Sequence, residues 1–290
     1  TGDSFGSGWY SRVQYMDILR FASERHIEVI PEIDVPGHAR AAIVAMKSRA
    51  ARLEAEGESE AAAEFRLDEP EDQSEYRSIQ NFDDNVINVC QESTYRFLEH
   101  VINDVVAMHN EAGAPLTTVH VGGDEVPAGV WTNSPACSTL ETEEGISGKN
   151  ELEQYFFSRL EGMLTSKNLK MAGWEEVAFM QDEEGNHVPN PEFNNTVIPH
   201  IWSNIWGGGT EEYAYELANS GFKVIMSHAS NFYFDFAYNK HWQEPGFYWA
   251  AMFNSRTPYS FIPFNLYRNA QTDSNGNPIS DEYFEGFEQL

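Results

Sequence analysis

The sequence has few basic residues and no long apolar run, and each shortage excludes a class of protein. Lysine and arginine total 18 against 46 aspartate and glutamate residues, which gives a formal charge of -28. So acidic a surface repels nucleic acid and anionic lipid, because both are bound through cationic side chains that face phosphates. No apolar stretch reaches about eighteen residues, the length that crosses a bilayer. We therefore expect no nucleic-acid partner and no membrane span.

Cysteine is also scarce. Cys90 and Cys137 are too few for a disulfide scaffold but enough for a single bridge, and two buried free thiols are the alternative. The strong acidity leaves a similar choice open, since it suits a neutral or cationic substrate and equally an adaptation to salty surroundings. With 290 residues and 41% hydrophobic content, the chain is long enough to bury the core of one large domain.

Short β-rich runs alternate with amphipathic stretches along the chain. The hydrophobic spacing predicts helices over 10–24, 39–55, 98–112, 150–167 and 210–220, with Gly113 at the end of the third. Buried strands are predicted over 27–33, 117–121, 169–174, 197–202 and 222–226. The segments 56–90 and 228–290 are expected to be surface excursions. Repeated strand-helix units indicate a parallel α/β fold, either a doubly wound sheet or a (β/α)8 barrel.

Two observations favour the barrel. No glycine-rich phosphate fingerprint follows the first predicted strand. Polar and aromatic residues instead gather directly after the strands, where barrel enzymes place their sites. The residues at these positions are Asp34, His38, His120, Asp124, Glu125, Trp174, Glu175, Glu176, Trp202, Trp206, Tyr233 and Asp235, with Trp249 farther on.

Carboxylates and aromatic rings are the combination that sugar chemistry requires. Aromatic faces stack on the apolar faces of pyranose rings, and carboxyl groups exchange protons with glycosidic oxygens. Each residue alone has a plainer interpretation: Asp124-Glu125 could favour a helix N-terminus, and a single histidine or tryptophan is usually structural. Gly122-Gly123 strengthens the catalytic interpretation, because two glycines allow a sharp turn that holds the acids at the strand end.

Two rival chemistries have weaker support. His38, His120, Asp124 and Glu125 could ligate zinc, but no HExxH spacing or comparable cluster is present. No G-x-S-x-G elbow is present for a serine nucleophile. We therefore predict no metal and no cofactor.

The segment 120–125, HVGGDE, resembles the H-x-G-G-D-E signature of family 20 glycoside hydrolases, the β-N-acetylhexosaminidases. The segment 26–38, HIEVIPEIDVPGH, resembles the strand that precedes it in that family. Trp174-Glu175-Glu176, the Trp202 strand and the segment 233–235 resemble later strand ends. The similarity runs from about Trp9 to about Thr272, and bacterial chitobiases are the nearest in pattern.

The resemblance implies a retaining, substrate-assisted mechanism. The 2-acetamido oxygen of the sugar attacks the anomeric carbon and forms an oxazolinium ion, so no protein nucleophile is needed. By family position Glu125 is the general acid and then base, and Asp124 orients the acetamido N–H. A charged Asp124 is expected to raise the pKa of Glu125 by like-charge repulsion.

The resemblance also implies the remaining site residues. His38 matches the histidine that hydrogen-bonds the acid. Trp174 and Trp202 would enclose the acetamido methyl, Tyr233 would donate to the acetamido oxygen, and Trp249 would stack on a second sugar. The predicted sugar-binding set is completed by Asp235, His120 and Asp34.

The sequence departs from the family pattern at both ends of the barrel. The predicted strands match about the third to the seventh of the eight strands that such barrels contain. The family's arginine on the first strand, its aspartate that holds the histidine, and its tryptophan and glutamate on the eighth have no match. We therefore expect residues 1–290 to form a partial (β/α)8 catalytic domain, with the other strands in the parent chain or a partner. These residues alone are not expected to be fully active.

Three functional hypotheses follow. The first is an N-acetylhexosaminidase of a bacterium, secreted, periplasmic or attached to the outer membrane, that acts on chitobiose, chitin oligosaccharides or other terminal N-acetylhexosamines. In that compartment a Cys90–Cys137 bridge would be favoured. The second is a non-catalytic barrel remnant that binds chitin or GlcNAc. The third is a retaining hydrolase with a protein nucleophile, which would need two carboxylates on separate strands.

Overall fold

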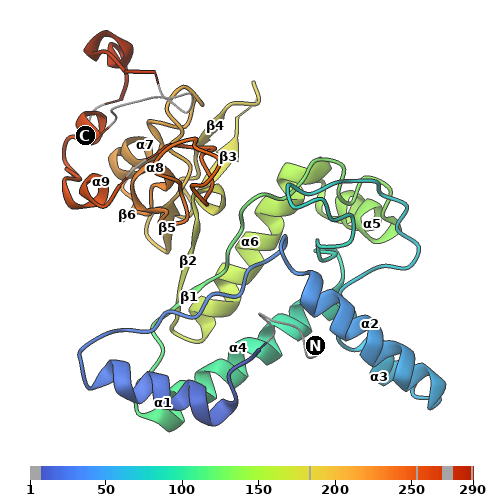
Figure 1. Ribbon diagram of the computed structural model, residues 1–290. Coiled ribbons are helices and arrows are strands. Elements are labelled where there is room, and N and C mark those ends of the chain that lie inside the picture. The colour runs from blue at the N-terminus through green and yellow to red at the C-terminus, as the bar shows by residue number, and fades with distance from the viewer. Residues whose placement is uncertain (1–7, 183, 253, 270–276, 289) are drawn as a thin grey trace. The chain divides into compact units, whose positions relative to one another are not determined.

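The computed structural model describes residues 8–182, 184–252, 254–269, 277–288 and 290. The chain divides into two units, Thr1–Met171 and Ala172–Leu290, each with its own internal contacts. The units are therefore described one at a time, with the elements labelled as in Figure 1.

Unit 1 is mainly helical. Its helices are α1 (Arg12–Ser23), α2 (Arg40–Ala55), α3 (Ser59–Ala63), α4 (Glu92–Ala112), α5 (Pro135–Glu144) and α6 (Gly148–Ser166). Helix α1 packs against α4, and α2 packs against α3 (Figure 1). Helices α1, α2, α4 and α6 confirm predicted helices, and most of their ends lie within a few residues of the predicted ends. Helices α3 and α5 are not predicted by the sequence pattern.

Helices α4 and α6 supply much of the core of unit 1. Leu98 and Ile102 of α4 are almost fully buried, as its hydrophobic spacing predicts, and α6 buries Leu152, Phe156, Phe157, Leu160 and Leu164. Each large apolar side chain that leaves water contributes about 1.5–3 kcal/mol to folding. Helix α4 ends where predicted, at Gly113, whose φ of 73° is left-handed and suits glycine.

Short strands lie side by side in the order of the sequence. Strands β1 (Thr118–His120), β2 (Lys170–Trp174), β5 (Val197–Ile201) and β6 (Ile225–Met226) form one sheet in the order β1-β2-β5-β6. Strands β5 and β6 are parallel, and helix α7 (Tyr213–Asn219) connects them, as parallel pairing requires. The structure therefore confirms a parallel α/β fold with strands at four of the five predicted places.

The predicted buried strand over 27–33 is wrong in most of its length. Only Glu32 forms a bridge, parallel to His120, while Ile27 and Ile30 are 58% and 39% exposed. Backbone bonds nevertheless run alongside β1, from Ile33 N–H to the His120 carbonyl and from His120 N–H to the Pro31 carbonyl. Proline lacks an N–H and cannot complete a ladder, so the run pairs only at its end.

Unit 2 contains a feature that the sequence pattern did not predict. Strands β3 (Phe179–Gln181) and β4 (His187–Pro189) form an antiparallel hairpin after the 3₁₀ helix η1 (Glu175–Ala178). The described residues of the aromatic-rich segment after β6 form short helices, α8 (Ala229–Phe232), α9 (Arg256–Tyr259), η2 (Leu266–Asn269) and η3 (Asp281–Phe284), and one parallel bridge between Phe236 and Phe247. A small core of Ala229, Phe236, Ala250 and Ala251 anchors this segment.

A disulfide joins Cys90, just before α4, to Cys137 in α5, with their Cα atoms 5.0 Å apart. Among the described residues, no helix combines the length and apolar character that a membrane crossing requires.

Candidate active site

The predicted acids follow β1 on a turn that requires glycine. Gly122 and Gly123 have φ values of 70° and 98°. A Cβ on Gly122 would lie 1.8 Å from Asp34 Oδ1 and 2.7 Å from Asp34 Cα. A side chain at this position would collide with Asp34, so glycine is needed for both the backbone conformation and the space. The turn brings the segment that carries Asp124 against the one that carries Asp34.

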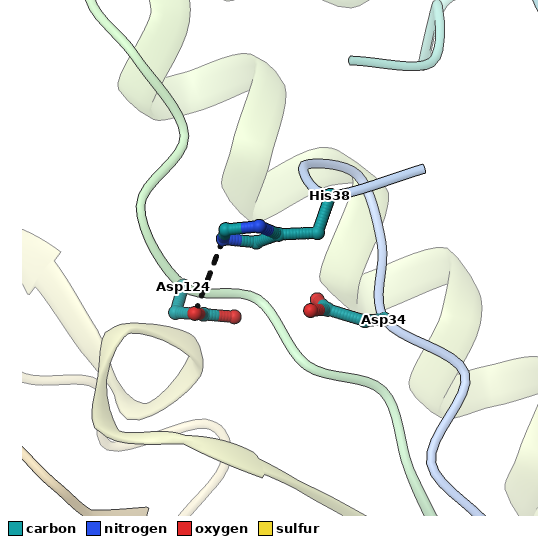
Figure 2. Close-up of side chains that lie close together, drawn as sticks. All are labelled: Asp34, His38 and Asp124. Atoms are coloured by element: carbon teal, nitrogen blue, oxygen red, sulfur yellow. Dashed lines mark ion pairs between the residues drawn. The ribbon is translucent and has the colours of Figure 1, made fainter. Parts of the chain in front are cut away.

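Four side chains of unit 1, Asp34, His38, Asp124 and Glu125, form a cluster that we call the carboxylate group. His38 Nε2 lies 3.3 Å from Asp124 Oδ2 and 3.5 Å from Glu125 Oε2, so one imidazole edge faces both predicted catalytic acids. Figure 2 shows Asp34 and His38 on one segment and Asp124 on the other, with the His38–Asp124 ion pair dashed. His38 and Glu125 both have left-handed φ values, 51° and 52°. Left-handed non-glycine residues are uncommon and concentrate at functional sites.

The pKa of His38 is raised from 6.5 to about 9, first by its hydrogen bond to Asp124 and further by the charges of Asp124, Asp34 and Glu125, against the effect of burial. The pKa of Asp34 is raised from 3.8 to about 7, chiefly by burial and by the charge of Asp124. At neutral pH His38 therefore carries a positive charge among carboxyl groups, and Asp34 is close to half protonated.

The ligand atoms of Asp34, His38 and Asp124 lie within 4.8 Å of one another, close enough to surround an ion. Histidine binds metal only through an unprotonated nitrogen. With its pKa raised to about 9, His38 is protonated at neutral pH, so a metal ion would have to displace this proton before it could bind.

His120, predicted to bind sugar, is only 4% exposed. Its Nδ1 accepts a hydrogen bond from the Gly122 N–H at 3.2 Å and lies 3.5 Å from Glu32 Oε1. These contacts support the glycine turn, and the prediction that His120 contacts sugar stays a prediction.

Gln80 joins the carboxylate group from a loop that sequence reasoning did not single out. Its Nε2 donates to Glu125 Oε2 at 2.7 Å, across 45 positions of the chain. No local pattern marks this residue, because the contact exists only once the loop has folded beside the turn.

In unit 2, three predicted residues gather into what we call the aromatic group: Trp202, Tyr233 and Trp249. The Trp249 ring lies edge-on to the other two, with centroids 6.0 Å from each. Phe236, 5.0 Å from Trp249, packs beside them. The structure thus brings together residues from the end of β5 and from the aromatic-rich segment, and their contact with sugar stays a prediction.

Two acidic residues after β2 hold Trp202. Glu175 is 2% exposed, and its carboxylate accepts the backbone N–H groups of Trp202 at 2.8 Å and Ser203 at 2.9 Å. The Trp202 indole Nε1 donates to the Glu176 carboxylate at 3.2 Å. The sequence predicts both glutamates only as strand-end residues. Their hydrogen bonds to Trp202 are seen only in the structure.

The remaining predicted residues of unit 2 have contacts of other kinds. Trp174, the last residue of β2, packs edge-on against His200 at 6.0 Å. Asp235 is exposed, and its carbonyl accepts the Phe247 N–H. Trp206 is 2% exposed and packs against Phe284, so it belongs to the core.

Comparison with known proteins places these groups in context. The sequence profile described as "Glycosyl hydrolase family 20, catalytic domain" matches residues 2–286. The chain is 35% identical over 280 residues to a β-hexosaminidase of Vibrio vulnificus, covering 95% of this chain and 32% of that protein. It is 36% identical to the N,N'-diacetylchitobiase of Vibrio harveyi, covering 96% of this chain and 34% of that one.

Solved structures agree with this similarity. The exo-β-N-acetylglucosaminidase of Vibrio harveyi, in complex with N-acetylglucosamine, has a TM-score of 0.70 at 30% identity, covering 91% of this chain and 36% of that one. This chain therefore spans about a third of the length of the relatives that it matches.

Proposed function

Because the chain belongs to glycosyl hydrolase family 20, we propose that it is the catalytic part of a β-N-acetylhexosaminidase that removes terminal β-linked N-acetylhexosamine from chitobiose and chitin oligosaccharides. The observation that carries this proposal is the contact of one imidazole, His38, with two adjacent acids, Asp124 and Glu125. Support for the substrate class comes from the similarity to a chitobiase and to an enzyme that binds N-acetylglucosamine.

In the proposed mechanism Glu125 is the general acid. The acetamido oxygen of the bound sugar donates an electron pair to the anomeric carbon, and the glycosidic bond breaks with its electrons on the leaving oxygen. That oxygen takes the proton of Glu125 and departs as an alcohol. Glu125 then removes a proton from the water that opens the oxazolinium ring.

Asp124 is proposed to orient the acetamido N–H and to offset the positive charge that develops on the ring. The protonated His38, 3.3 Å from Asp124 Oδ2, supports this role, because the ion pair restrains the carboxyl group. Asp34 contributes a second, partly protonated carboxyl group beside Asp124. Preorganised charges of this kind are a large part of catalysis, because they need no rearrangement as the reaction proceeds.

The aromatic group is proposed to bind the sugar. Trp202 would enclose the acetamido methyl with Trp174, Tyr233 would donate to the acetamido oxygen, and Trp249 would stack on the second sugar. Asp235, His120 and Asp34 remain proposed contacts for polar groups of the sugar. The double support of Trp202 by Glu175 and Glu176 fits a ring that must be held in one orientation.

We further propose that residues 1–290 supply about the third to seventh strands of a (β/α)8 barrel, with the third reduced to the bridge at Glu32, and that the other strands lie elsewhere in the protein. Parallel strands in sequence order support this arrangement. The proposed location is outside the cytoplasm, in the periplasm, on the outer membrane or secreted, where the Cys90–Cys137 bridge would persist.

The decisive experiment measures release of a chromophore from an aryl N-acetyl-β-glucosaminide by the protein at its natural full length. Glu125→Gln should leave the thermal unfolding curve unchanged and lower kcat on a poorly activated substrate by at least roughly 10²-fold, the usual contribution of acid–base catalysis. Wild-type turnover from the Glu125→Gln variant would remove the acid assignment. Saturable binding without any release by the wild type would instead indicate a sugar-binding module.

A further inference from the structure

We propose that Gln80 is a positioning residue for the general acid: its amide N–H holds Glu125 Oε2 as the carbonyl oxygen, so that the transferable proton is carried on Oε1. This inference rests on the proposed role of Glu125. It adds a residue from outside the strand ends, on a loop that lies before α4 in the sequence.

The contact itself assigns the two oxygens different roles. Gln80 Nε2 donates to Glu125 Oε2 at 2.7 Å, and His38 Nε2 approaches the same oxygen at 3.5 Å. A protonated carboxyl group has one oxygen that only accepts and one that carries the hydrogen. The amide donor and the positively charged imidazole both lie on the side of Oε2, so they favour the form in which the hydrogen lies on Oε1. A general acid with its proton on a fixed atom is already oriented toward the glycosidic oxygen before the reaction starts.

The turn that carries Gln80 is held by its own hydrogen bonds. Ser78 N–H donates to the Phe82 carbonyl at 2.8 Å, and Phe82 N–H donates to Ser78 Oγ at 3.1 Å. Arg77 donates to the Asn81 carbonyl at 2.8 Å. Gln80 lies between these contacts. Its side chain is exposed to solvent, but the hydrogen bonds of the turn fix the backbone that carries it.

The same loop is tied to the segment that carries His38. Ala39 N–H donates to the Asn85 carbonyl at 2.9 Å, and Arg40 Nε donates to Asp84 Oδ1 at 2.7 Å. The Arg40 guanidinium also lies over the Phe82 ring, 5.0 Å from its centroid. The loop therefore holds Gln80 at a fixed place relative to His38, and both side chains approach Glu125 from one connected structure.

Gln80 and His38 differ in how they respond to pH. The amide is uncharged and does not titrate, whereas His38 gains or loses its charge. Gln80 thus keeps its full contribution when His38 loses its positive charge, and its loss should matter most on the alkaline side of the pH–rate profile.

The test uses aryl N-acetyl-β-glucosaminides whose leaving phenols become progressively better leaving groups: phenyl, 4-nitrophenyl and 2,4-dinitrophenyl. Poor leaving groups need the acid and good ones do not, and none of these substrates carries a second sugar that Gln80 could contact. The full-length protein is compared with Gln80→Met, which keeps the size of the side chain but removes the donor. Gln73→Met is the matched control, since Gln73 is an exposed glutamine of the same loop whose side-chain amide hydrogen-bonds, among the described residues, to the Asp72 carbonyl alone.

For Gln80→Met, kcat on the phenyl glycoside should fall about tenfold, the value of one hydrogen bond, with less than about twofold change on the dinitrophenyl glycoside. The fall should grow above the pH at which His38 loses its proton. Gln73→Met should match the wild type throughout, and all three thermal unfolding curves should coincide.

Glu125→Gln separates failure of this inference from failure of the proposed function. If Glu125→Gln shows a strong dependence on the leaving group and Gln80→Met shows none, Gln80 does not position the acid. An equal loss on all three aryl substrates would likewise overturn the inference, because it indicates a general structural effect. If Glu125→Gln itself shows no dependence, the acid assignment and the inference fall together.

Discussion

The buried carboxylate of Glu175 offers a sharp test of how the aromatic group is built. It accepts two backbone N–H groups, from Trp202 at 2.8 Å and Ser203 at 2.9 Å, while only 2% of the residue is exposed. In Glu175→Gln one oxygen can still accept, but the other becomes an NH₂ group that faces a backbone N–H. The change keeps the shape of the side chain and removes half of its accepting capacity.

The cost follows from these contacts. Losing one charge-assisted hydrogen bond and leaving one buried donor without its acceptor should lower the free energy of unfolding by about 2–4 kcal/mol. Glu176→Gln is the matched control, because its amide oxygen can still accept from the Trp202 indole, and about 1 kcal/mol or less should be lost. Glu175→Gln should also raise KM, since the backbone that carries Trp202 is no longer fixed.

Urea unfolding of both variants, followed by circular dichroism, measures the difference through the shift in midpoint at unchanged slope. Equal midpoints for Glu175→Gln and Glu176→Gln would contradict the proposed support by the two N–H bonds. A more stable Glu175→Gln would mean that the cost of burying the charge exceeds the gain from both bonds.

Two further predictions concern unit 1. Replacing both Cys90 and Cys137 by serine should lower the free energy of unfolding by about 4 kcal/mol, because the bridge closes a loop with a sequence separation of 47; an unfolding midpoint unaffected by both the replacement and a reducing agent would contradict this. Stability should also fall with rising pH, because the folded-state pKa values of Asp34 and His38 both lie above their ordinary values. The His38 contribution is complete below pH 6.5 and is lost as the pH rises through about 9, and the Asp34 contribution is complete below 3.8 and is lost through about 7. Urea unfolding across this range should therefore show a decline between pH 6.5 and 9 that His38→Gln abolishes, and a decline that persists in the variant would assign it to other groups.

Much of the architecture could be predicted because it depends on local pattern. The spacing of Leu98 and Ile102, with Gly113 at the end, is enough to define α4. Strands at 118–120 and 197–201 follow from short apolar runs bounded by polar or flexible residues. Helix α5 was missed although Ser134 and Pro135 are typical of a helix start, because its sequence has little hydrophobic spacing to support them.

The incorrect or missing strand predictions concern segments whose structure depends on contacts with other parts of the chain. The apolar character of residues 27–33 suits a buried strand, yet Pro31 and the partial pairing with β1 leave Ile27 and Ile30 exposed. The β3–β4 hairpin is similar, since its short strands, such as Phe179–Gln181, carry too few residues to show a period of two.

The candidate site likewise has some features that the local sequence predicts and others that depend on the fold. Asp124 and Glu125 are adjacent in sequence and follow two glycines, so their closeness and the sharp turn are local properties that any reader of the sequence can derive. Their orientation is not local, because it depends on side chains from other segments, His38 from the segment after the Glu32 bridge and Gln80 from the loop. A carboxyl group that acts as a general acid must have the right orientation as well as the right position. A misplacement of about 1 Å can lower the rate by roughly 10²-fold. Residues that orient the acid should therefore affect the rate nearly as much as the residues that flank it in sequence, although no sequence motif contains them.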